Sequence, residues 1–181
     1  GAYTKVRARY PLDVDHQTIL DSGANTDGEW DSWANHIFIH GSSYVEVDGF
    51  FINARDNSSY NCVLVTAGSS YIKIKRCSLR RTVTTTGNID ASLFEVGMST
   101  AYAGDPPHHI LFEDCSATGH FRYMFSVMGY NDNAGVDRRT SYVIFRRCVA
   151  RADYTVSGNP ISIFEIYGNR VTNEADLGPH D

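Results

Sequence analysis

A short pattern occurs four times in this chain and constrains the fold more than any other feature. The copies begin at Tyr44, Tyr71, His109 and Tyr142 and align without gaps as YVEVDGFFI, YIKIKRCSL, HILFEDCSA and YVIFRRCVA. Their irregular spacing indicates a constant structural unit joined by loops of different length. Such a unit predicts a solenoid, in which successive coils stack the same sequence positions on one another.

Apolar and polar residues alternate within each copy, as in a β-strand that buries one face. The predicted inward residues are Val45 and Val47, Ile72 and Ile74, Ile110 and Phe112, and Val143 and Phe145. A second set of strands lies between the copies, in HIFIHG, CVLVTAG, LFEVG, MFSVMG and IFEIYG. Its predicted inward columns are Ile37, Val63, Phe94, Phe125 and Phe164, and Ile39, Val65, Val96, Val127 and Ile166. The sequence therefore predicts an all-β solenoid of stacked parallel strands.

The outward positions of the repeated strand test this register independently. One outward column reads Asp48, Lys75, Glu113 and Arg146, and its neighbour reads Gly49, Arg76, Asp114 and Arg147. Stacked strands lie about 4.8 Å apart, so opposite charges on adjacent coils attract and like charges repel. The sign of the charge alternates at nearly every step from coil to coil, which supports this stacking.

The chain divides into two parts on this reading. Residues 1–35 are expected to form the first strands and the first loop of the solenoid. Residues 36–181 are expected to form the regular coils, with long loops at 97–108, 128–141 and 167–181. No amphipathic helix is visible that would cover either end. We therefore expect an uncapped portion of a longer solenoid, or one whose ends are covered by missing coils or other chains.

Charge and hydrophobicity exclude two classes of partner. The formal net charge is −5, whereas nucleic-acid binding normally requires a basic face. No apolar run approaches the roughly 18 residues of a membrane span. We therefore expect neither a nucleic-acid partner nor a membrane span.

The segment before the first full coil resembles the beginning of the pectate-lyase-like superfamily of right-handed parallel β-helices. The resemblance is carried by Arg7-Ala8-Arg9-Tyr10-Pro11 and Leu20-Asp21-Ser22-Gly23, which are followed by HIFIHGSSYVEVDGF. It covers most of the chain but is architectural, and this superfamily contains many activities. It implies a right-handed, single-stranded parallel β-helix in an extracellular or cell-surface setting. It further implies polysaccharide as the partner and, for an enzyme, polysaccharide lyase or glycoside hydrolase chemistry.

The second set of strands carries the candidate catalytic residues. Its outward column contains Glu95 and Glu165 two coils apart, which corresponds to about 9.6 Å. An inverting glycosidase needs carboxylates about 6.5–9.5 Å apart. The short connection that contains His120, Arg122 and Tyr123 is expected to lie beside this face.

The long loops carry the candidate substrate-binding residues, because loops on a rigid scaffold are where sites are usually built. These residues are Tyr102, Tyr130, Asp132, Arg138 and Arg139. The alternative is that the loops only cover the flank of the solenoid or contact neighbouring chains. No cofactor or metal site is predicted, with a calcium requirement left open.

Three functions from different classes remain open at this point. The first is an extracellular β-helix that engages polysaccharide, with lyase or hydrolase activity undecided. The second is a non-catalytic structural or adhesive solenoid, such as a fibre, spike or surface element, which the charge columns and the lack of a complete catalytic signature support. The third is a sugar-binding module without catalysis, in which Tyr102, Tyr123 and Tyr130 contact the sugar.

Overall fold

The computed structural model describes most of the stacked coils. The described residues are 2–8, 19–21, 36–54, 61–81, 92–97, 104–119, 122–129, 140–152 and 162–168. They form β-strands, all of them paired in parallel. The fold is therefore an all-β parallel solenoid, as the sequence predicts.

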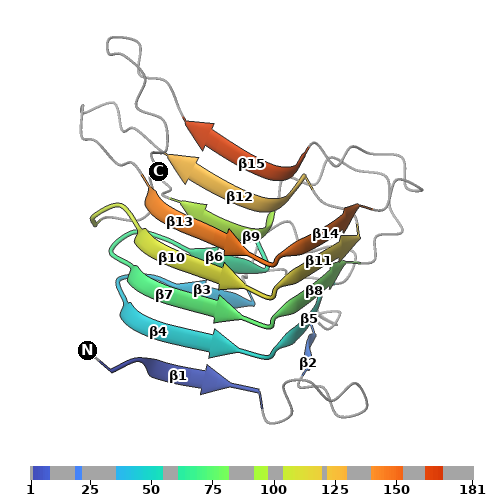
Figure 1. The fold of residues 1–181 in the computed structure, drawn as a ribbon, viewed down its shortest axis with the longest axis horizontal. Coiled ribbons are helices and arrows are strands. Elements are labelled where there is room, and N and C mark those ends of the chain that lie inside the picture. Colours follow the sequence, from blue (N-terminus) through green and yellow to red (C-terminus); the bar gives the residue numbers. More distant parts are fainter. Residues whose placement is uncertain are drawn as a thin grey trace, which may run out of the picture.

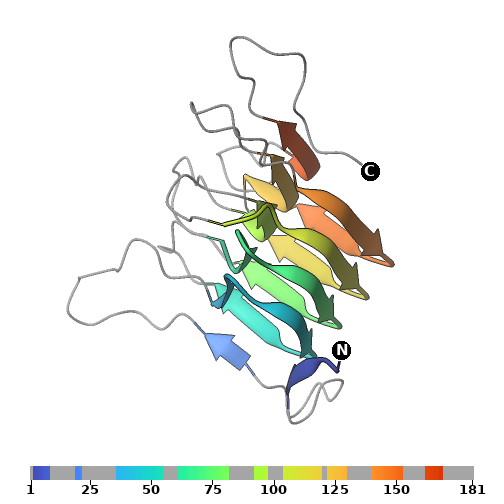
Figure 2. The same cartoon turned by 90° about the vertical axis from the view of Figure 1, so that its left-hand side faces the viewer.

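Three five-stranded sheets form the walls of the solenoid (Figures 1 and 2). Sheet A consists of β1 (Thr4–Arg7), β4 (Ser43–Asp48), β7 (Ser70–Lys75), β10 (His108–Glu113) and β13 (Ser141–Arg146). Sheet B consists of β2 (Ile19–Asp21), β5 (Phe51–Ala54), β8 (Ser78–Arg81), β11 (Ser116–Gly119) and β14 (Val149–Ala152). Sheet C consists of β3 (Ile37–Ile39), β6 (Val63–Val65), β9 (Ser92–Gly97), β12 (Tyr123–Gly129) and β15 (Ser162–Gly168). Each coil passes through sheets A, B and C in that order.

The strand register confirms the columns that the sequence predicts. In sheet A, Asp48 pairs with Lys75, Lys75 with Glu113, and Glu113 with Arg146. The predicted inward columns of sheet C are also aligned strand by strand. Two further strands, β1 and β2, precede the first repeat and pair with β4 and β5.

The repeated pattern forms two strands because its backbone turns sharply in the middle. The turning residues Gly49, Arg76, Asp114 and Arg147 have φ values of 82°, 50°, 55° and 53°. Each non-glycine residue in this left-handed conformation costs about 1 kcal/mol. The amide of each corner residue donates to a carbonyl of the next coil at Lys75, Glu113 or Arg146 where that coil is described. These hydrogen bonds and the ion pairs of the corner side chains offset the backbone cost.

Phenylalanine rings fill the core toward the C-terminal end. In sheet C, Phe94, Phe125 and Phe164 form one stack with centroid distances of 4.9 and 4.8 Å. Phe112 and Phe145 of sheet A stack at 5.1 Å and meet the first column edge-on. Toward the N-terminal end the same columns contain aliphatic residues, including Val63 and Ile74. The core is therefore continuous, with the larger side chains in the later coils.

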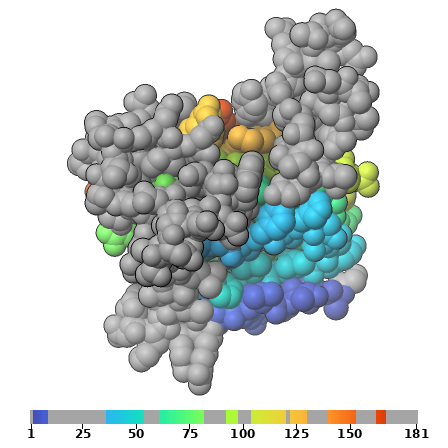
Figure 3. Space-filling view, turned by 180° about the vertical axis from the view of Figure 1, so that it is seen from behind, coloured from blue at the N-terminus to red at the C-terminus, as the bar shows by residue number. Residues whose placement is uncertain are grey.

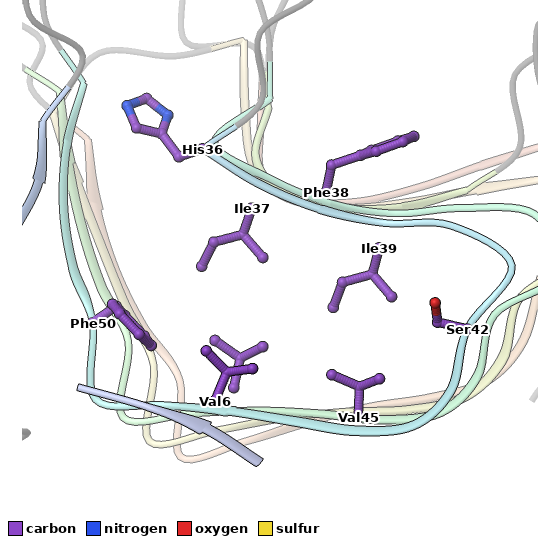
Figure 4. A pocket seen from close by; sticks show the side chains of 9 residues that line it. Val6, His36, Ile37, Phe38, Ile39, Ser42, Val45 and Phe50 are labelled. Carbon is purple, nitrogen blue, oxygen red and sulfur yellow. The ribbon is translucent and has the colours of Figure 1, made fainter. Parts of the chain in front are cut away.

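The N-terminal end of the core is open in the described part of the chain. The first described coil consists of β1, β2 and β3, and no described strand precedes it in any of the three sheets. A cavity of about 450 Å³ lies in this coil. Figure 4 shows Val6, Ile37, Ile39 and Val45 pointing into it, while Phe38 lies on the other side of its strand.

The outer face of sheet A is a ladder of ion pairs between coils. Glu46 and Asp48 are buried and contact Lys5, Arg7, Lys75 and Arg76. Two coils later, at the end of β10, Glu113 contacts Lys75, Arg146 and Arg147. The neighbouring Asp114 contacts Arg147. The predicted alternation of charge is thus present as direct contacts.

These contacts make the stability of the fold depend on pH. Burial alone would raise the pKa of Glu113, but the hydrogen bond from Arg147 and the charge of Arg146 outweigh it and lower this pKa. The hydrogen bond from Arg147 also lowers the pKa of Asp114. A depressed folded-state pKa stabilises the fold above the unfolded-state pKa, and this contribution is lost as pH falls through the folded value.

We therefore expect acid to destabilise the fold below the unfolded-state pKa values, which are about 4.3 for Glu and about 3.9 for Asp. The midpoint of urea unfolding should change little between about pH 7 and pH 5 and should fall below about pH 4. Glu113→Gln should lower the midpoint at neutral pH and flatten this dependence. An unaltered acid dependence in that variant would contradict the assignment.

Candidate functional site

The outer face of sheet C aligns the two candidate catalytic carboxylates. Its outward column reads Phe38, Leu64, Glu95, Ser126 and Glu165, in the predicted order. Ser126 pairs directly with both Glu95 and Glu165. The backbone positions of the two glutamates are therefore two strand spacings apart, about 9.6 Å. Figure 3 shows the molecule from behind, on the side opposite to the view of Figure 1.

Ser126 is the unusual member of this column. Its side chain is 0% exposed although it lies on the outward face of the sheet. Its hydroxyl has no hydrogen-bond partner. Glu95 and Glu165 are partly buried on either side of it. The column thus places an unsatisfied hydroxyl between two acidic side chains.

Arg122 and Tyr123 lie where β12 begins. The guanidinium carbon of Arg122 is 5.1 Å from the centroid of the Tyr123 ring. The Arg122 carbonyl accepts a hydrogen bond from the Ser162 amide at the beginning of β15. Tyr123 is buried and lies on the same, inward face of β12 as Phe125 and Val127. Arg122 and Tyr123 therefore lie together at the beginning of β12. Glu95 and Glu165 instead share the outward column of sheet C, on either side of Ser126.

The remaining candidates lie outside the described residues. They are His120, Tyr102, Tyr130, Asp132, Arg138 and Arg139. Their proposed roles in catalysis or substrate binding stay predictions.

Three of the four cysteines, Cys77, Cys115 and Cys148, occupy equivalent positions in successive coils, and Cys62 lies before β6 of sheet C. Cys62, Cys77 and Cys115 are buried and Cys148 is partly buried, all with free thiols. Burial raises the pKa of Cys62 to about 12 and that of Cys77 to about 11. A hydrogen bond from Cys115 lowers the pKa of the partly buried Cys148. Within the described ranges, no three His, Cys, Asp or Glu side chains come together as they would around a metal ion.

A stack of exposed and partly exposed rings runs along sheet A and was not predicted from the sequence. Tyr44, Tyr71, His109 and Tyr142 each have a φ between 52° and 59°. Successive ring centroids are 4.8, 4.7 and 4.6 Å apart. The signal was present, because an aromatic or histidine residue begins every copy of the repeat.

In comparisons with known proteins, no protein family, curated protein or solved structure matches the chain. None of the described segments forms a helix of the length and apolarity needed to cross a membrane.

Proposed function

We propose that this protein binds polysaccharide along the outer face of sheet C, in an extracellular or cell-surface setting. The observation that carries the proposal is the buried Ser126 hydroxyl, which lacks a partner between two carboxylates. A buried hydroxyl without a hydrogen bond costs about 1–3 kcal/mol, and a native structure contains few such groups. Glu95 and Glu165 are partly exposed, so a ligand rich in hydroxyl groups would donate hydrogen bonds to these carboxylates. Contact with the 0% exposed Ser126 hydroxyl would require this face to open locally.

Charge favours a neutral polysaccharide over an acidic one. Glu95 and Glu165 flank the hydroxyl, and the whole chain has a net charge of −5. A polyanion would bring further carboxylates against these groups and would be repelled. A linear polymer that runs along the solenoid axis would instead meet one sheet C strand after another.

Hydrolysis is the second candidate function, because the two carboxylates flank one position of the face. Their backbone spacing of about 9.6 Å lies just above the range of about 6.5–9.5 Å between the carboxylates of an inverting glycosidase. A lyase is supported less, since its uronate substrates carry the charge that this face disfavours. The non-catalytic structural or adhesive solenoid remains the rival, and the continuous ion-pair ladder of sheet A supports it.

Ser126→Ala tests polysaccharide binding against a purely structural role, because it should increase stability and weaken binding. Removal of an unsatisfied buried hydroxyl should raise the free energy of unfolding by about 1 kcal/mol. The same change should weaken binding to a neutral polysaccharide by roughly fivefold or more. Urea unfolding and affinity electrophoresis in gels that contain β-glucan, xylan or polygalacturonate measure the two effects.

Thr66→Val is the matched control. The Thr66 hydroxyl is also buried and lacks a hydrogen-bond partner, but it lies in the turn after β6. This variant should gain stability in the same way and should bind polysaccharide like the unaltered protein. Unretarded migration of the unaltered protein in every neutral gel would refute the proposal and favour the structural solenoid.

Glu95→Gln and Glu165→Gln test hydrolysis separately. New reducing ends that disappear in both variants would establish hydrolysis. Retardation in the gel without new reducing ends would establish binding alone.

A further inference from the structure

One strand of sheet A departs from the repeat at two adjacent positions. The first two residues of β4, β7 and β13 are serine and tyrosine, whereas those of β10 are both histidine. In chain order the pairs are Ser43-Tyr44, Ser70-Tyr71, His108-His109 and Ser141-Tyr142. His108 is paired in register with both Ser70 and Ser141. β10 lies between β7 and β13 (Figure 1), so this departure is inside the sheet and not at an open end.

Ring stacking does not explain the histidine at position 109. The His109 ring lies between those of Tyr71 and Tyr142, at centroid distances of 4.7 and 4.6 Å. Tyrosine fills the same place in the other three copies and stacks equally well, since Tyr44 and Tyr71 are 4.8 Å apart. An imidazole at this position therefore supplies something other than a stacked ring.

The two imidazoles converge. The Nδ1 atoms of His108 and His109 are 2.7 Å apart. Adjacent side chains of a regular strand point to opposite faces, but His109 has a φ of 57°, which breaks this alternation. The two rings lie at 79° to one another, and the His108 ring also meets Tyr71 edge-on at 5.8 Å. Ring contacts thus hold both histidines with their Nδ1 atoms together.

The backbone around the pair is fixed on both sides. The His108 amide donates to the Ser69 carbonyl at 3.2 Å, and the Pro107 carbonyl accepts from the Ser141 amide at 3.3 Å. His108 is partly buried and His109 is exposed, so solvent reaches the pair. Burial and the charge of His109 lower the pKa of His108, and the negative charge of Asp105 opposes this lowering. An acidic side chain therefore lies close enough to the pair to attract a cation.

This geometry is close to that of a chelating pair. Imidazole nitrogen is a favoured ligand of Cu²⁺, Ni²⁺ and Zn²⁺. Two nitrogens that bind one ion at about 2.0–2.1 Å lie roughly 2.8–3.4 Å apart for angles at the metal of about 90° to 109°. The Nδ1 atoms, at 2.7 Å, would need to separate by only a few tenths of an ångström.

From these observations we propose that His108 and His109 chelate a divalent transition-metal ion through their Nδ1 atoms. Two protein ligands are fewer than the four of a closed structural centre, so water would fill the other coordination positions. Cu²⁺ should bind more tightly than Ni²⁺ or Zn²⁺, as is general for sites with nitrogen ligands. This proposal does not depend on polysaccharide binding.

The repeat itself supplies the variants that test the proposal. His108→Ser and His109→Tyr each restore the residue that the other three copies have, so both variants should keep the fold and its circular dichroism. Titration calorimetry with NiCl₂ should show that each variant binds Ni²⁺ about tenfold or more weakly than the unaltered protein, because the second imidazole binds intramolecularly. Electron paramagnetic resonance of the Cu²⁺-loaded protein should show two nitrogen ligands, and fewer in either variant.

His40→Ala is the control for histidine content. His40 is exposed and its ring stacks on that of Phe38 at a centroid distance of 6.0 Å, in the coil that contains β3. This variant should bind Ni²⁺ like the unaltered protein. An equal loss of affinity in His40→Ala, or no loss in His108→Ser and His109→Tyr, would overturn the proposal.

Urea unfolding shows whether the folded geometry matters, because adjacent histidines are also close in the unfolded chain. An ion that binds the folded state more tightly stabilises it. NiCl₂ should therefore raise the urea midpoint of the unaltered protein and leave those of His108→Ser and His109→Tyr nearly unchanged. The same midpoint with and without NiCl₂ in the unaltered protein would show that the fold does not build the site, and would also overturn the proposal.

Discussion

Gly119→Ala is expected to destabilise the fold by roughly 3–5 kcal/mol. Gly119 ends β11 with a φ of 113°, which lies outside the regions that side chains with a Cβ readily adopt. A Cβ at this position would lie 2.0 Å from the carbonyl oxygen of Arg81 and 2.9 Å from its carbonyl carbon. Both neighbours are backbone atoms of β8, which is paired in register with β11. Relief of the clash therefore requires two strands of sheet B to separate.

Gly41→Ala is the matched control for this prediction. Gly41 also has a positive φ, 58°, but a Cβ there would meet no atom within 4 Å. Its cost should be limited to that of the left-handed backbone, about 1 kcal/mol. Urea unfolding of both variants at pH 7 measures the difference. Equal losses in the two variants would show that the contact with Arg81 is not what requires glycine at position 119.

The sequence predicts the columns well because each column obeys simple chemistry. Inward positions must be apolar, and outward charges on adjacent coils must alternate. The pairing of Asp48 with Lys75, and of Lys75 with Glu113, follows from those two rules and is present in the structure. Irregular loop lengths did not obscure the pattern, since the strands themselves align without gaps.

The corner within the repeat was visible only as a break in alternation. Inward residues Val47 and Phe50 are three positions apart, which shows that the alternation breaks between them but not how. The structure shows a left-handed residue at this break, and three of the four such residues are charged. Propensity alone would not assign that conformation to Arg76 or Arg147, because the compensating contacts come from neighbouring coils. Gly119 illustrates the same limit: its requirement arises from the approach of Arg81, distant in sequence.

The candidate site was predictable in its alignment but not in its burial. The order Glu95, Ser126, Glu165 follows from the strand register. The complete burial of Ser126 depends on what packs against the outward face of sheet C, and alternation predicts the opposite. The observation that supports the proposed function therefore lies where the rule for outward positions fails.

Phe125→Ala is expected to cost about 3–5 kcal/mol, the range for a large buried aromatic residue. The Phe125 ring is fully buried between Phe94 and Phe164, at centroid distances of 4.9 and 4.8 Å. The ring of Phe145 meets it edge-on at 5.4 Å. Truncation would leave a cavity that the paired strands β9 and β15 cannot close without breaking their register with β12.

Phe164→Ala provides the contrast within the same column. Phe164 is 48% exposed, so its truncation removes less buried surface and should cost about 1–2 kcal/mol. Coils of a solenoid interact mainly with their nearest neighbours, so the loss at Phe125 should spread to adjacent coils before distant ones. Hydrogen exchange of the Phe125→Ala variant should therefore accelerate in β9, β12 and β15 more than in β3 and β6. Uniform acceleration in all three sheets would instead show that the solenoid unfolds as one cooperative unit, and that the phenylalanine stack stabilises it as a whole.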